Sequence, residues 1–432
     1  MASATASHRF GFETRMLHAG HIPDGLTGSR AVPIYQTTSY VFDDVDTAAQ
    51  LFELKEYGHI YTRIGNPTTA VLEERIASLE NATGAVATAS GMAAQFVALM
   101  TLLAPGDEVV ASAHLYGGTV TQLTHTFRKL SVDVRFVDPT DLGAWERAIT
   151  PRTRALYGET IGNPRGSILD LGALAALAEA HRIPLVIDNT FATPYLCRPI
   201  DWGATIVLHS ATKFIGGHGN SIGGLILESG KFDYSDFPTV AAPSPSYHGL
   251  RFYDTFGHYG FLMKARAETV RDTGACISPT NAFLLLQGLE TLALRMERHV
   301  ANARAVAEFL RDHPRVAWVS YAGLADHPDH ALAQKYLGGR PGAVFAFGLD
   351  AGDARAAGRR FIESLQLFSH LANVGDARSL VIHPASTTHQ QLNEAELERA
   401  GVAPELIRLS VGLETLEDLL WDLDQALRAT SA

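Results

Sequence analysis

Short apolar runs alternate with segments of helical periodicity between residues 69 and 227. The runs are rich in β-branched and aliphatic residues and are bounded by turn formers, which is typical of buried strands. The predicted strands are 85–88, 108–111, 133–137, 155–157, 184–187, 205–208 and 225–227, and the predicted helices are 69–79, 92–103, 118–130 and 171–181. Because strands and helices alternate, we predict an α/β fold with a mostly parallel sheet covered by helices on both faces.

The pattern changes on either side of this region and divides the chain into three predicted units. Residues 1–65 show weak periodicity and many turn formers, so we expect an extended arm packed on another part of the protein or on a second subunit. Residues 66–274 form the predicted main domain, with an irregular insertion at 230–260 rich in proline and aromatic residues. Residues 275–432 form a smaller C-terminal α/β domain. Its predicted elements are helices 282–311, 354–365 and 416–428 and strands 343–348, 379–382 and 406–411.

The composition of the 432 residues sets broad limits on function. With 46% hydrophobic and 19% charged residues, the chain is typical of a globular protein with substantial cores. Its formal net charge of -11 argues against a nucleic-acid partner held by phosphate neutralisation. No apolar run reaches the length needed to cross a bilayer, and the first twenty residues lack the core of a signal peptide. We therefore expect a soluble, cytoplasmic protein.

Cysteine and histidine show no site-forming pattern. The two cysteines, Cys197 and Cys276, imply neither a disulfide framework nor a cysteine-rich zinc site, and they fit a reducing compartment. The eighteen histidines are scattered without the spacing of metal ligands. We therefore predict no metal site.

One lysine stands alone between an apolar strand and a glycine cluster. Lys213 is the only residue between Ala204 and Gly219 with a charged side chain, histidines aside. Poor solvation favours the neutral amine of such a lysine, and that is the form that can make a Schiff base. Ser210 and Thr212 flank it with hydroxyl donors suited to a phosphate. A surface lysine in a turn is the alternative interpretation.

Two further candidates follow predicted strands. Ser90-Gly91-Met92 stands between a strand and a helix, where free backbone N–H groups can bind phosphate, although the serine could equally be a simple helix cap. Asp188 ends the apolar strand that begins at Ile183, so its carboxylate needs a strong partner. It is either a loop acid or the group that keeps a pyridinium nitrogen protonated. Ligands bind at the carboxyl ends of parallel strands, where both Lys213 and Asp188 fall.

Two weaker candidates have side chains suited to a flat, anionic ligand. Tyr116 precedes paired glycines that would let a flat ligand approach, and its ring offers a stacking face. Arg408 lies within the apolar run 406–411. A desolvated arginine normally pairs with an acid, which could be an amino-acid carboxylate or a partner in the chain.

Rival motifs are less well supported. The segment 219–223 matches the G-x-S-x-G pattern of a hydrolase nucleophile, with Ser221 at its centre. An apolar strand follows it, whereas that motif requires a helix. Gly217-His-Gly219 opens like a dinucleotide fingerprint, but Ile222 occupies the third glycine position.

Six motifs occur in one order along the chain. They are Tyr61-Thr-Arg-Ile-Gly-Asn-Pro67, Ser90-Gly-Met-Ala-Ala94, Leu115-Tyr-Gly-Gly118, Glu159-Thr-Ile-Gly-Asn-Pro164, Ile187-Asp-Asn-Thr-Phe191 and His209-Ser-Ala-Thr-Lys-Phe214. With them the chain resembles, over nearly its whole length, the cysteine/methionine-metabolism family of pyridoxal-phosphate (PLP) enzymes of fold type I. Segments 116–119, 373–376, 383–389 and 230–260 are most similar to those of the O-acetylhomoserine sulfhydrylases. Methionine γ-lyases typically carry cysteine at the position of Gly118, so this glycine argues against a lyase without excluding one.

The resemblance implies a role for each matching residue. Lys213 would bind pyridoxal 5'-phosphate covalently and then shuttle protons, Asp188 would pair with the ring nitrogen, and Tyr116 would stack on the ring. The phosphate would be held by the backbone N–H groups of Gly91 and Met92, by Ser210 and Thr212, and by Tyr61 and Arg63 of a neighbouring subunit. The substrate carboxylate would be held by Arg408 and Asn163, with Asn373 nearby.

The resemblance also implies a reaction and an assembly. The expected reaction joins O-acetyl-L-homoserine to sulfide, giving L-homocysteine and acetate, or to methanethiol, giving L-methionine. The expected assembly is a homotetramer of dimers with shared active sites. Tyr61 and Tyr116 are counted, with Lys213, among the catalytic residues. Activity of the methionine γ-lyase or cystathionine γ-synthase type is the alternative, and a serine hydrolase using Ser221 is a more distant one.

Overall fold

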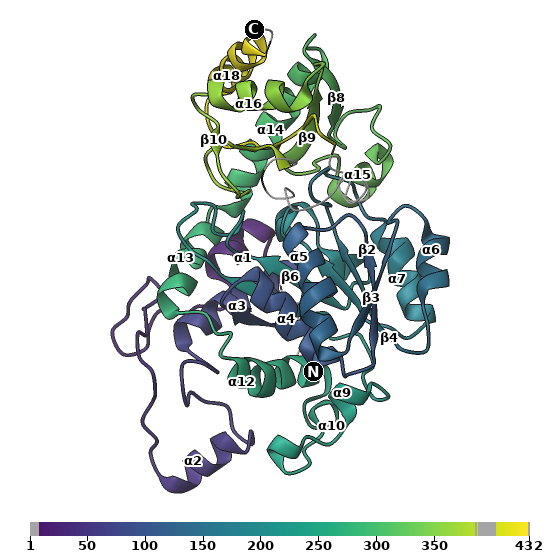
Figure 1. Ribbon diagram of the computed structural model, residues 1–432. Helices are drawn as coiled ribbons and strands as arrows, with labels where there is room; N and C mark the ends of the chain where they lie inside the picture. Colours follow the sequence, from purple (N-terminus) through teal and green to yellow (C-terminus); the bar gives the residue numbers. More distant parts are fainter. Residues whose placement is uncertain (1–7, 385–386, 388–402, 431–432) are drawn as a thin grey trace.

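A seven-stranded sheet forms the centre of the larger body in the computed structural model, which describes residues 8–384, 387 and 403–430 (Figure 1). Its strands are ordered β1-β7-β6-β5-β4-β2-β3. They are β1 (Gly84–Thr88), β2 (Glu108–Ser112), β3 (Asp133–Val137), β4 (Thr153–Glu159), β5 (Leu185–Asp188), β6 (Ile206–Ser210) and β7 (Gly224–Glu228). The strands from β6 to β3 are parallel, whereas β7 runs antiparallel to both β1 and β6. The mostly parallel sheet predicted from the sequence is confirmed.

Different helices cover the two faces of this sheet. Successive side chains of a strand point to opposite faces, and in β4 Leu156 packs in one hydrophobic cluster while Ala155 and Tyr157 pack in another. The first cluster includes residues of α3 (Pro67–Glu80) and α7 (Leu171–Ala180), and the second includes residues of α4 (Gly91–Leu102). Both faces are therefore buried, and the carboxyl edge of the strands is left for a site.

A five-stranded mixed sheet forms the smaller lobe at the top of Figure 1. Its order is β10-β11-β12-β9-β8, with β8 (Val316–Ser320), β9 (Val344–Leu349), β10 (Ser369–His370), β11 (Leu380–Ile382) and β12 (Leu406–Ser410). Its helices are α14 (Leu292–Arg311), α15 (His330–Leu337), α16 (Ala354–Ser364) and α18 (Leu416–Ala429). The sequence predicted β9, β11 and β12 but missed β8, β10 and α15.

Two predicted helices are each divided in the structure. The predicted helix 118–130 is built of three short helical pieces, α5 (Gly117–Thr121), η1 (Gln122–Thr126) and η2 (Phe127–Leu130), and η1 is a π-helix. The predicted helix 282–311 is two helices, α13 and α14, that meet at Glu290-Thr291. The remaining helices are α1 (Phe12–His18), α2 (Val45–Phe52), α6 (Leu142–Ala148), α8 (Thr193–Leu196), η3 (Pro199–Trp202), α9 (Pro238–Ala241), η4 (Pro245–Tyr247), α10 (Phe252–Phe256), η5 (Gly257–Tyr259), α11 (Gly260–Lys264), η6 (Ala265–Val270), α12 (Arg271–Thr273) and α13 (Pro279–Leu289).

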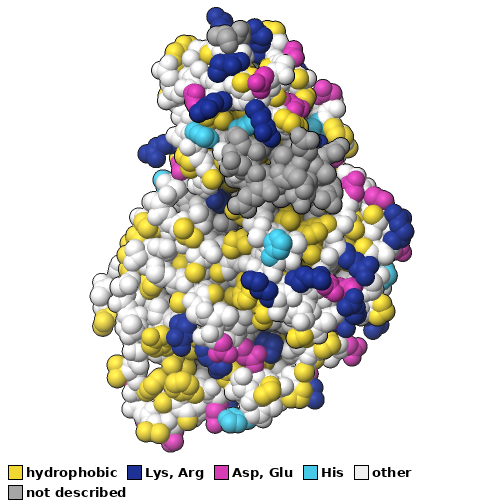
Figure 2. All heavy atoms as spheres, viewed as in Figure 1, with side chains coloured by type: hydrophobic (Ala, Val, Ile, Leu, Met, Phe, Trp, Pro, Cys, Tyr) yellow, Lys and Arg dark blue, Asp and Glu magenta, His cyan; other side chains and the backbone are white. Residues whose placement is uncertain are grey.

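The N-terminal arm leaves much apolar surface uncovered. Its helix α1 packs on α3, whereas α2 lies far from the two sheets (Figure 1). Five of its apolar side chains are more than four-fifths exposed, namely Ile22, Leu26, Val41, Val45 and Tyr57. Figure 2 shows hydrophobic side chains gathered at the lower left of the molecule, where Figure 1 places the arm.

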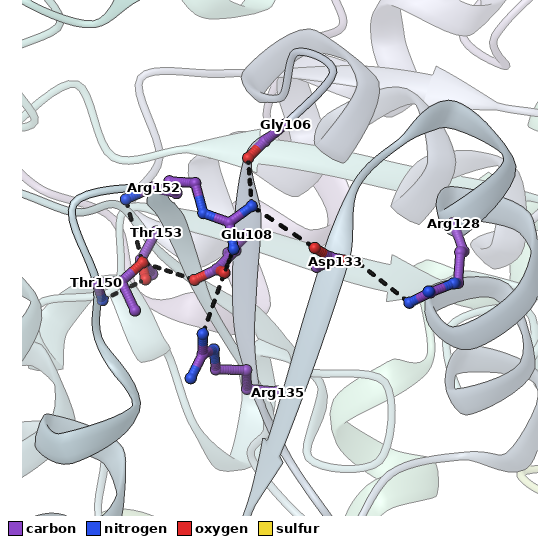
Figure 3. Close-up of polar contacts among 8 residues, drawn as sticks. All are labelled: Gly106, Glu108, Arg128, Asp133, Arg135, Thr150, Arg152 and Thr153. Carbon is purple, nitrogen blue, oxygen red and sulfur yellow. Dashed lines mark hydrogen bonds and ion pairs between the residues drawn. The ribbon is translucent and has the colours of Figure 1, made fainter.

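An ion-pair network closes the amino-terminal edge of the large sheet (Figure 3). Glu108, the first residue of β2, is 1% exposed and accepts hydrogen bonds from Arg135, Arg152 and the Thr150 hydroxyl. Burial alone would raise the pKa of Glu108, but the Thr150 hydroxyl and the two guanidinium groups outweigh burial and hold the pKa below its usual value. This carboxylate therefore ties β3 and the start of β4 to β2.

The described residues contain neither a membrane-spanning helix nor a cluster of metal-binding side chains. None of their helices combines the length and apolar character needed to span a bilayer. Within the same residues, no three histidine, cysteine or acidic side chains come together in a way that could hold a metal ion.

Candidate active site

A cavity opens at the carboxyl edge of the large sheet and extends toward the small one. It encloses about 1100 Å³, including its open mouth. Strands β4, β5 and β6 reach it with their last residues, and β12 of the small sheet contributes Arg408. Ten of the twelve residues predicted for the site line this cavity, namely Gly91, Met92, Tyr116, Asn163, Asp188, Ser210, Thr212, Lys213, Asn373 and Arg408.

Lys213 lies in the turn that follows β6 and has no acidic partner among the residues that the structure describes. Its Nζ donates a hydrogen bond to Asn373 Oδ1. Burial, assisted by the nearby positive charge of Arg408, lowers the pKa of Lys213 from 10.5 to about 8. More of this amine is therefore neutral near physiological pH than in an ordinary lysine, and the neutral form is the one that attacks a carbonyl carbon.

Asp188 ends β5 with its carboxylate in the cavity and without a described cation partner. Its Oδ1 accepts a hydrogen bond of 2.9 Å from the Thr190 N–H. Burial raises the pKa of Asp188, while the Thr190 hydrogen bonds and the proximity of His209 oppose the rise. A positively charged ligand group would satisfy this carboxylate, and a protonated ring nitrogen is one such group.

The start of α4 forms a close-fitting cradle for an anion. The Ser90 side chain caps the helix by accepting a hydrogen bond of 3.1 Å from the Ala93 N–H. Gly91 comes so close to β6 that a Cβ atom there would lie 2.6 Å from the Ser210 Cβ. The free amides of the first helical turn and the Ser210 hydroxyl thus border the same space, which suits a phosphate.

Tyr116 is held by its backbone, while its ring remains half exposed. The Tyr116 N–H donates a hydrogen bond of 2.7 Å to Glu159 Oε1, and its residue caps α5. The ring lies over Gly118, where a Cβ atom would come 2.4 Å from Tyr116 Cε1. The glycine thus provides the space that the ring occupies beside the cavity.

Arg408 is 8% exposed and is bound by two amide oxygens. Its guanidinium donates hydrogen bonds of 3.1 Å to Asn163 Oδ1 and of 3.1 Å to the Asn373 carbonyl. Burial lowers the pKa of Arg408 to about 10, and the proximity of Tyr116 opposes the fall. With no carboxylate paired to it in the described part of the chain, Arg408 offers its charge to an anionic ligand.

Tyr61 and Arg63 do not line the cavity formed by their own chain. Tyr61 is 40% exposed, and the Arg63 guanidinium lies over its ring at 5.0 Å from the centroid. The expected role of these two residues in a neighbouring subunit remains a prediction.

Several lining residues were not predicted as site residues, among them Gln95, Glu159 and Thr190. Glu159 opens one of the six motifs, but the predicted strand 155–157 stopped two residues before it, whereas β4 extends to Glu159, so the sequence did not place this acid at a strand end. Gln95 is one of two polar residues, with Thr101, in the otherwise apolar helix α4, and its Oε1 accepts hydrogen bonds from Tyr157 and Thr119. Of the segment 383–389, residues 385, 386, 388 and 389 lie outside the described residues.

Ser221 lacks the partners of a hydrolase nucleophile. It is buried, and its hydroxyl donates at 3.4 Å to the Asn281 carbonyl, with no histidine as a hydrogen-bond partner among the described residues. Strand β7 follows it, as the sequence indicated, so the strand–turn–helix arrangement is absent here.

The donor set of the cavity fits PLP. An amine with a lowered pKa, an unpaired carboxylate, a stacking ring and an anion cradle match the aldehyde, ring nitrogen, ring face and phosphate of that cofactor, in that order. Arg408 remains available for a second anionic group.

Comparisons with known proteins agree with this donor set. The family model described as Cys/Met metabolism PLP-dependent enzyme matches residues 13–428. The chain is 52% identical to O-acetyl-L-homoserine sulfhydrylase of Leptospira meyeri over 427 residues, covering 96% of each chain.

Two solved structures are similar over almost the full length. A candidate O-acetylhomoserine (thiol)-lyase from Campylobacter jejuni, which carries N'-pyridoxyl-lysine-5'-monophosphate, is 41% identical with a TM-score of 0.94, covering 97% of this chain and 100% of that one. Cystathionine γ-lyase from Lactobacillus plantarum, complexed with L-serine, is 34% identical with a TM-score of 0.84, covering 98% and 100%.

Proposed function

Because the chain belongs to the Cys/Met metabolism PLP-dependent enzyme family, we propose that it is an O-acetyl-L-homoserine sulfhydrylase. It joins O-acetyl-L-homoserine to sulfide and releases L-homocysteine and acetate. One observation carries this proposal: Lys213, with a pKa of about 8, shares a cavity with Asp188 and Arg408 in a chain related over its full length to a sulfhydrylase.

The residues of the cavity divide into cofactor and substrate groups. Lys213 would bind PLP covalently, Asp188 would hold its ring nitrogen protonated, and the Tyr116 ring would stack on it. When bound, the cofactor supplies a sink for the electrons of a carbanion. Its phosphate would be held by the Gly91 and Met92 amides and by the Ser210 and Thr212 hydroxyls.

The substrate carboxylate would be held by Arg408, Asn163 and Asn373. The guanidinium is already oriented by Asn163 Oδ1 and the Asn373 carbonyl. Neither of these oxygens neutralises it, so a carboxylate would supply the missing charge. The substrate Cγ and its acetyl group would then lie toward the open mouth of the cavity, where a thiol can enter.

Lys213 is suited to move protons during the replacement. A group with a pKa of about 8 can both accept and return a proton near neutral pH. We assign to its amine the proton of the substrate Cα. Loss of a second proton from Cβ allows acetate to leave Cγ, and the sulfur of the thiol takes its place as both protons return. Tyr116 lies close enough to the cavity to take part in these transfers.

We further infer that the arm completes the site of a neighbouring subunit. The exposed apolar side chains of the arm need a cover, and Tyr61 and Arg63 are absent from the cavity of their own chain. We propose a tetramer of dimers in which these two residues reach the phosphate site of the partner. A mixture of Arg63→Ala and Lys213→Ala proteins should regain activity through hybrid sites, whereas no regain would show that each chain is self-sufficient.

Elimination is the second candidate outcome at this site, because the chain also resembles a cystathionine γ-lyase in structure. Gly118 favours replacement, since methionine γ-lyases typically carry cysteine there. Cystathionine γ-synthase type activity would use an amino-acid thiol in place of sulfide.

The deciding experiment is a visible absorption spectrum of the PLP-loaded protein followed by a matrix of acyl donors and thiols. We expect homocysteine from O-acetyl-L-homoserine and sulfide, methionine with methanethiol, and slower turnover of the succinyl ester. Appreciable 2-oxobutanoate and ammonia under saturating sulfide would instead identify a lyase.

A further inference from the structure

Glu159 is a buried acid in the cavity to which the resemblance assigns no role. It ends β4, directly opposite Asp188 at the end of β5 in the parallel register. Its side chain is 8% exposed and lines the same cavity as Lys213. Within the described residues Glu159 forms no ion pair, so no nearby cation neutralises its carboxyl group.

The contact that Glu159 makes links it to the predicted cofactor site. Glu159 Oε1 accepts the Tyr116 N–H at 2.7 Å, and Tyr116 caps α5 without a side-chain cap of its own. The ring of Tyr116 is half exposed, so the residue is held beside the cavity by its backbone, whose N–H donates to Glu159 and whose carbonyl accepts the Val120 N–H at 3.1 Å.

The pairing with Asp188 adds a second function. Two carboxyl groups side by side in a buried edge cannot both be charged at low cost, so one of them keeps its proton. Burial, followed by the charge of Asp188, raises the pKa of Glu159 well above its usual value, and the Tyr116 and Asn163 amides oppose the rise only in part. Asp188, which accepts the Thr190 N–H, is the member of the pair that can ionise first.

We propose that Glu159 is a positioning residue of the cofactor site, whose protonated carboxyl group fixes Tyr116 over the cofactor ring and leaves the single negative charge of the pair on Asp188. This inference rests on the proposed PLP site. The acid thereby acts on two cofactor contacts at once, the ring face through Tyr116 and the ring nitrogen through Asp188.

Two variants separate the parts of this role. Glu159→Gln keeps an oxygen that can accept the Tyr116 N–H but cannot ionise. Glu159→Ala removes the acceptor. Glu228→Gln is the matched control, since Glu228 is a buried acid of the same sheet whose pKa burial raises to about 8 but which does not line the cavity.

The experiment measures the dissociation constant of PLP for each apo-protein by fluorescence titration between about pH 7 and pH 9.5. We expect Glu159→Ala to weaken binding by about tenfold or more, which corresponds to ~1.4 kcal/mol. Glu159→Gln should stay within about threefold of the wild type near pH 7 and should lose less affinity than the wild type as the pH rises, because it cannot place a second charge beside Asp188. The Glu228→Gln control should match the wild type.

Two results would overturn the proposal. One is Glu159→Ala binding PLP as tightly as the wild type, and the other is Glu159→Gln losing as much affinity as Glu159→Ala near pH 7. Failure of the wild-type protein itself to bind PLP would instead refute the proposed function, so the two failures are distinguishable. Circular dichroism of each apo-variant identifies any protein that has not folded before it is titrated.

Discussion

The buried charged groups at the two edges of the large sheet differ in whether they have a counter-ion. At the amino-terminal edge, Glu108 is surrounded by Arg135, Arg152 and the Thr150 hydroxyl, and its pKa lies below the usual value (Figure 3). At the carboxyl edge, Asp188 lacks a described counter-ion and has a raised pKa, while Lys213 has a lowered one. The same sheet therefore carries a fully paired acid at its amino-terminal edge, on β2, and unpaired groups at its carboxyl edge, at the ends of β5 and β6.

This difference teaches how the protein separates stability from chemistry. Paired charges hold strands together and have nothing left to offer a ligand. Groups that stay unpaired in a buried site cost stability, and perturbed pKa values of this kind cluster at functional sites. The carboxyl edge is thus prepared for a ligand that brings the missing partners.

The largest expected effect comes from removing the unpaired cation that faces substrate. Arg408→Ala should weaken binding of O-acetyl-L-homoserine by about 2–5 kcal/mol, because the substrate carboxylate loses its buried partner. Steady-state kinetics should show the loss mainly in KM. An unchanged KM would remove Arg408 from the carboxylate site, and Arg359→Ala, at an exposed pair of the small lobe, is the control.

The two edges should also respond to opposite ends of the pH scale. The pKa of Lys213 is about 8 in the folded apo-protein and 10.5 when unfolded, so the unfolded state binds more protons between these values and stability rises with pH there. The gain is at most about 3 kcal/mol. Glu108 has a lowered folded pKa, so its contribution is present above the unfolded value and is lost as pH falls toward the folded one.

Urea unfolding of apo-protein at a series of pH values measures both the alkaline rise and the acid fall in the free energy of unfolding. Lys213→Met should lack the alkaline rise, and Glu108→Gln should flatten the acid fall. If Lys213→Met kept the full alkaline rise, the lowered pKa would belong to another group.

Breaking the Glu108 network at the amino-terminal edge should lower the stability of the protein and leave its catalytic rate unchanged. Glu108→Ala removes the acceptor of three hydrogen bonds and should lower the free energy of unfolding by about 1–3 kcal/mol. The kcat of folded enzyme should stay within about twofold of the wild type, since the edges lie at opposite ends of the strands. A large fall in kcat at full PLP occupancy would contradict the division between the two edges.

The smallest expected effect concerns the space under Tyr116. Gly118→Ala would place a Cβ atom 2.4 Å from Tyr116 Cε1, so the ring must move. We expect kcat/KM to fall by about tenfold, or ~1.4 kcal/mol. Gly352→Ala, where no atom lies within 4 Å of the added Cβ, should leave kcat/KM unchanged. Equal kinetics of both variants would show that the ring position does not matter.

Much of this arrangement could be predicted because strands end where apolar runs end. That signal placed Asp188 and Lys213 at one edge, and the isolation of Lys213 in an apolar and glycine-rich stretch marked it as a candidate. The parallel order of the strands then implied that these groups meet.

Other parts depend on contacts that sequence periodicity does not encode. Lys213 contacts Asn373 across 160 positions, and Arg408 contacts Asn163 across 245. Glu159 was missed because its importance depends on which residue stands opposite it in the neighbouring strand. The sequence did not reveal that helix 118–130 is divided. Over so few residues, a π-helix and a 3₁₀-helix have nearly the same apolar periodicity as an α-helix.

The most direct test of the account is to locate the cofactor bond. PLP-loaded protein would be reduced with borohydride, digested and mapped by mass spectrometry, beside Lys213→Ala and Asp188→Ala variants. The account predicts a pyridoxyl group on the peptide that contains Lys213, its absence in Lys213→Ala, and its retention at much lower activity in Asp188→Ala. A pyridoxyl group on another lysine of the wild type, or none at all, would contradict it.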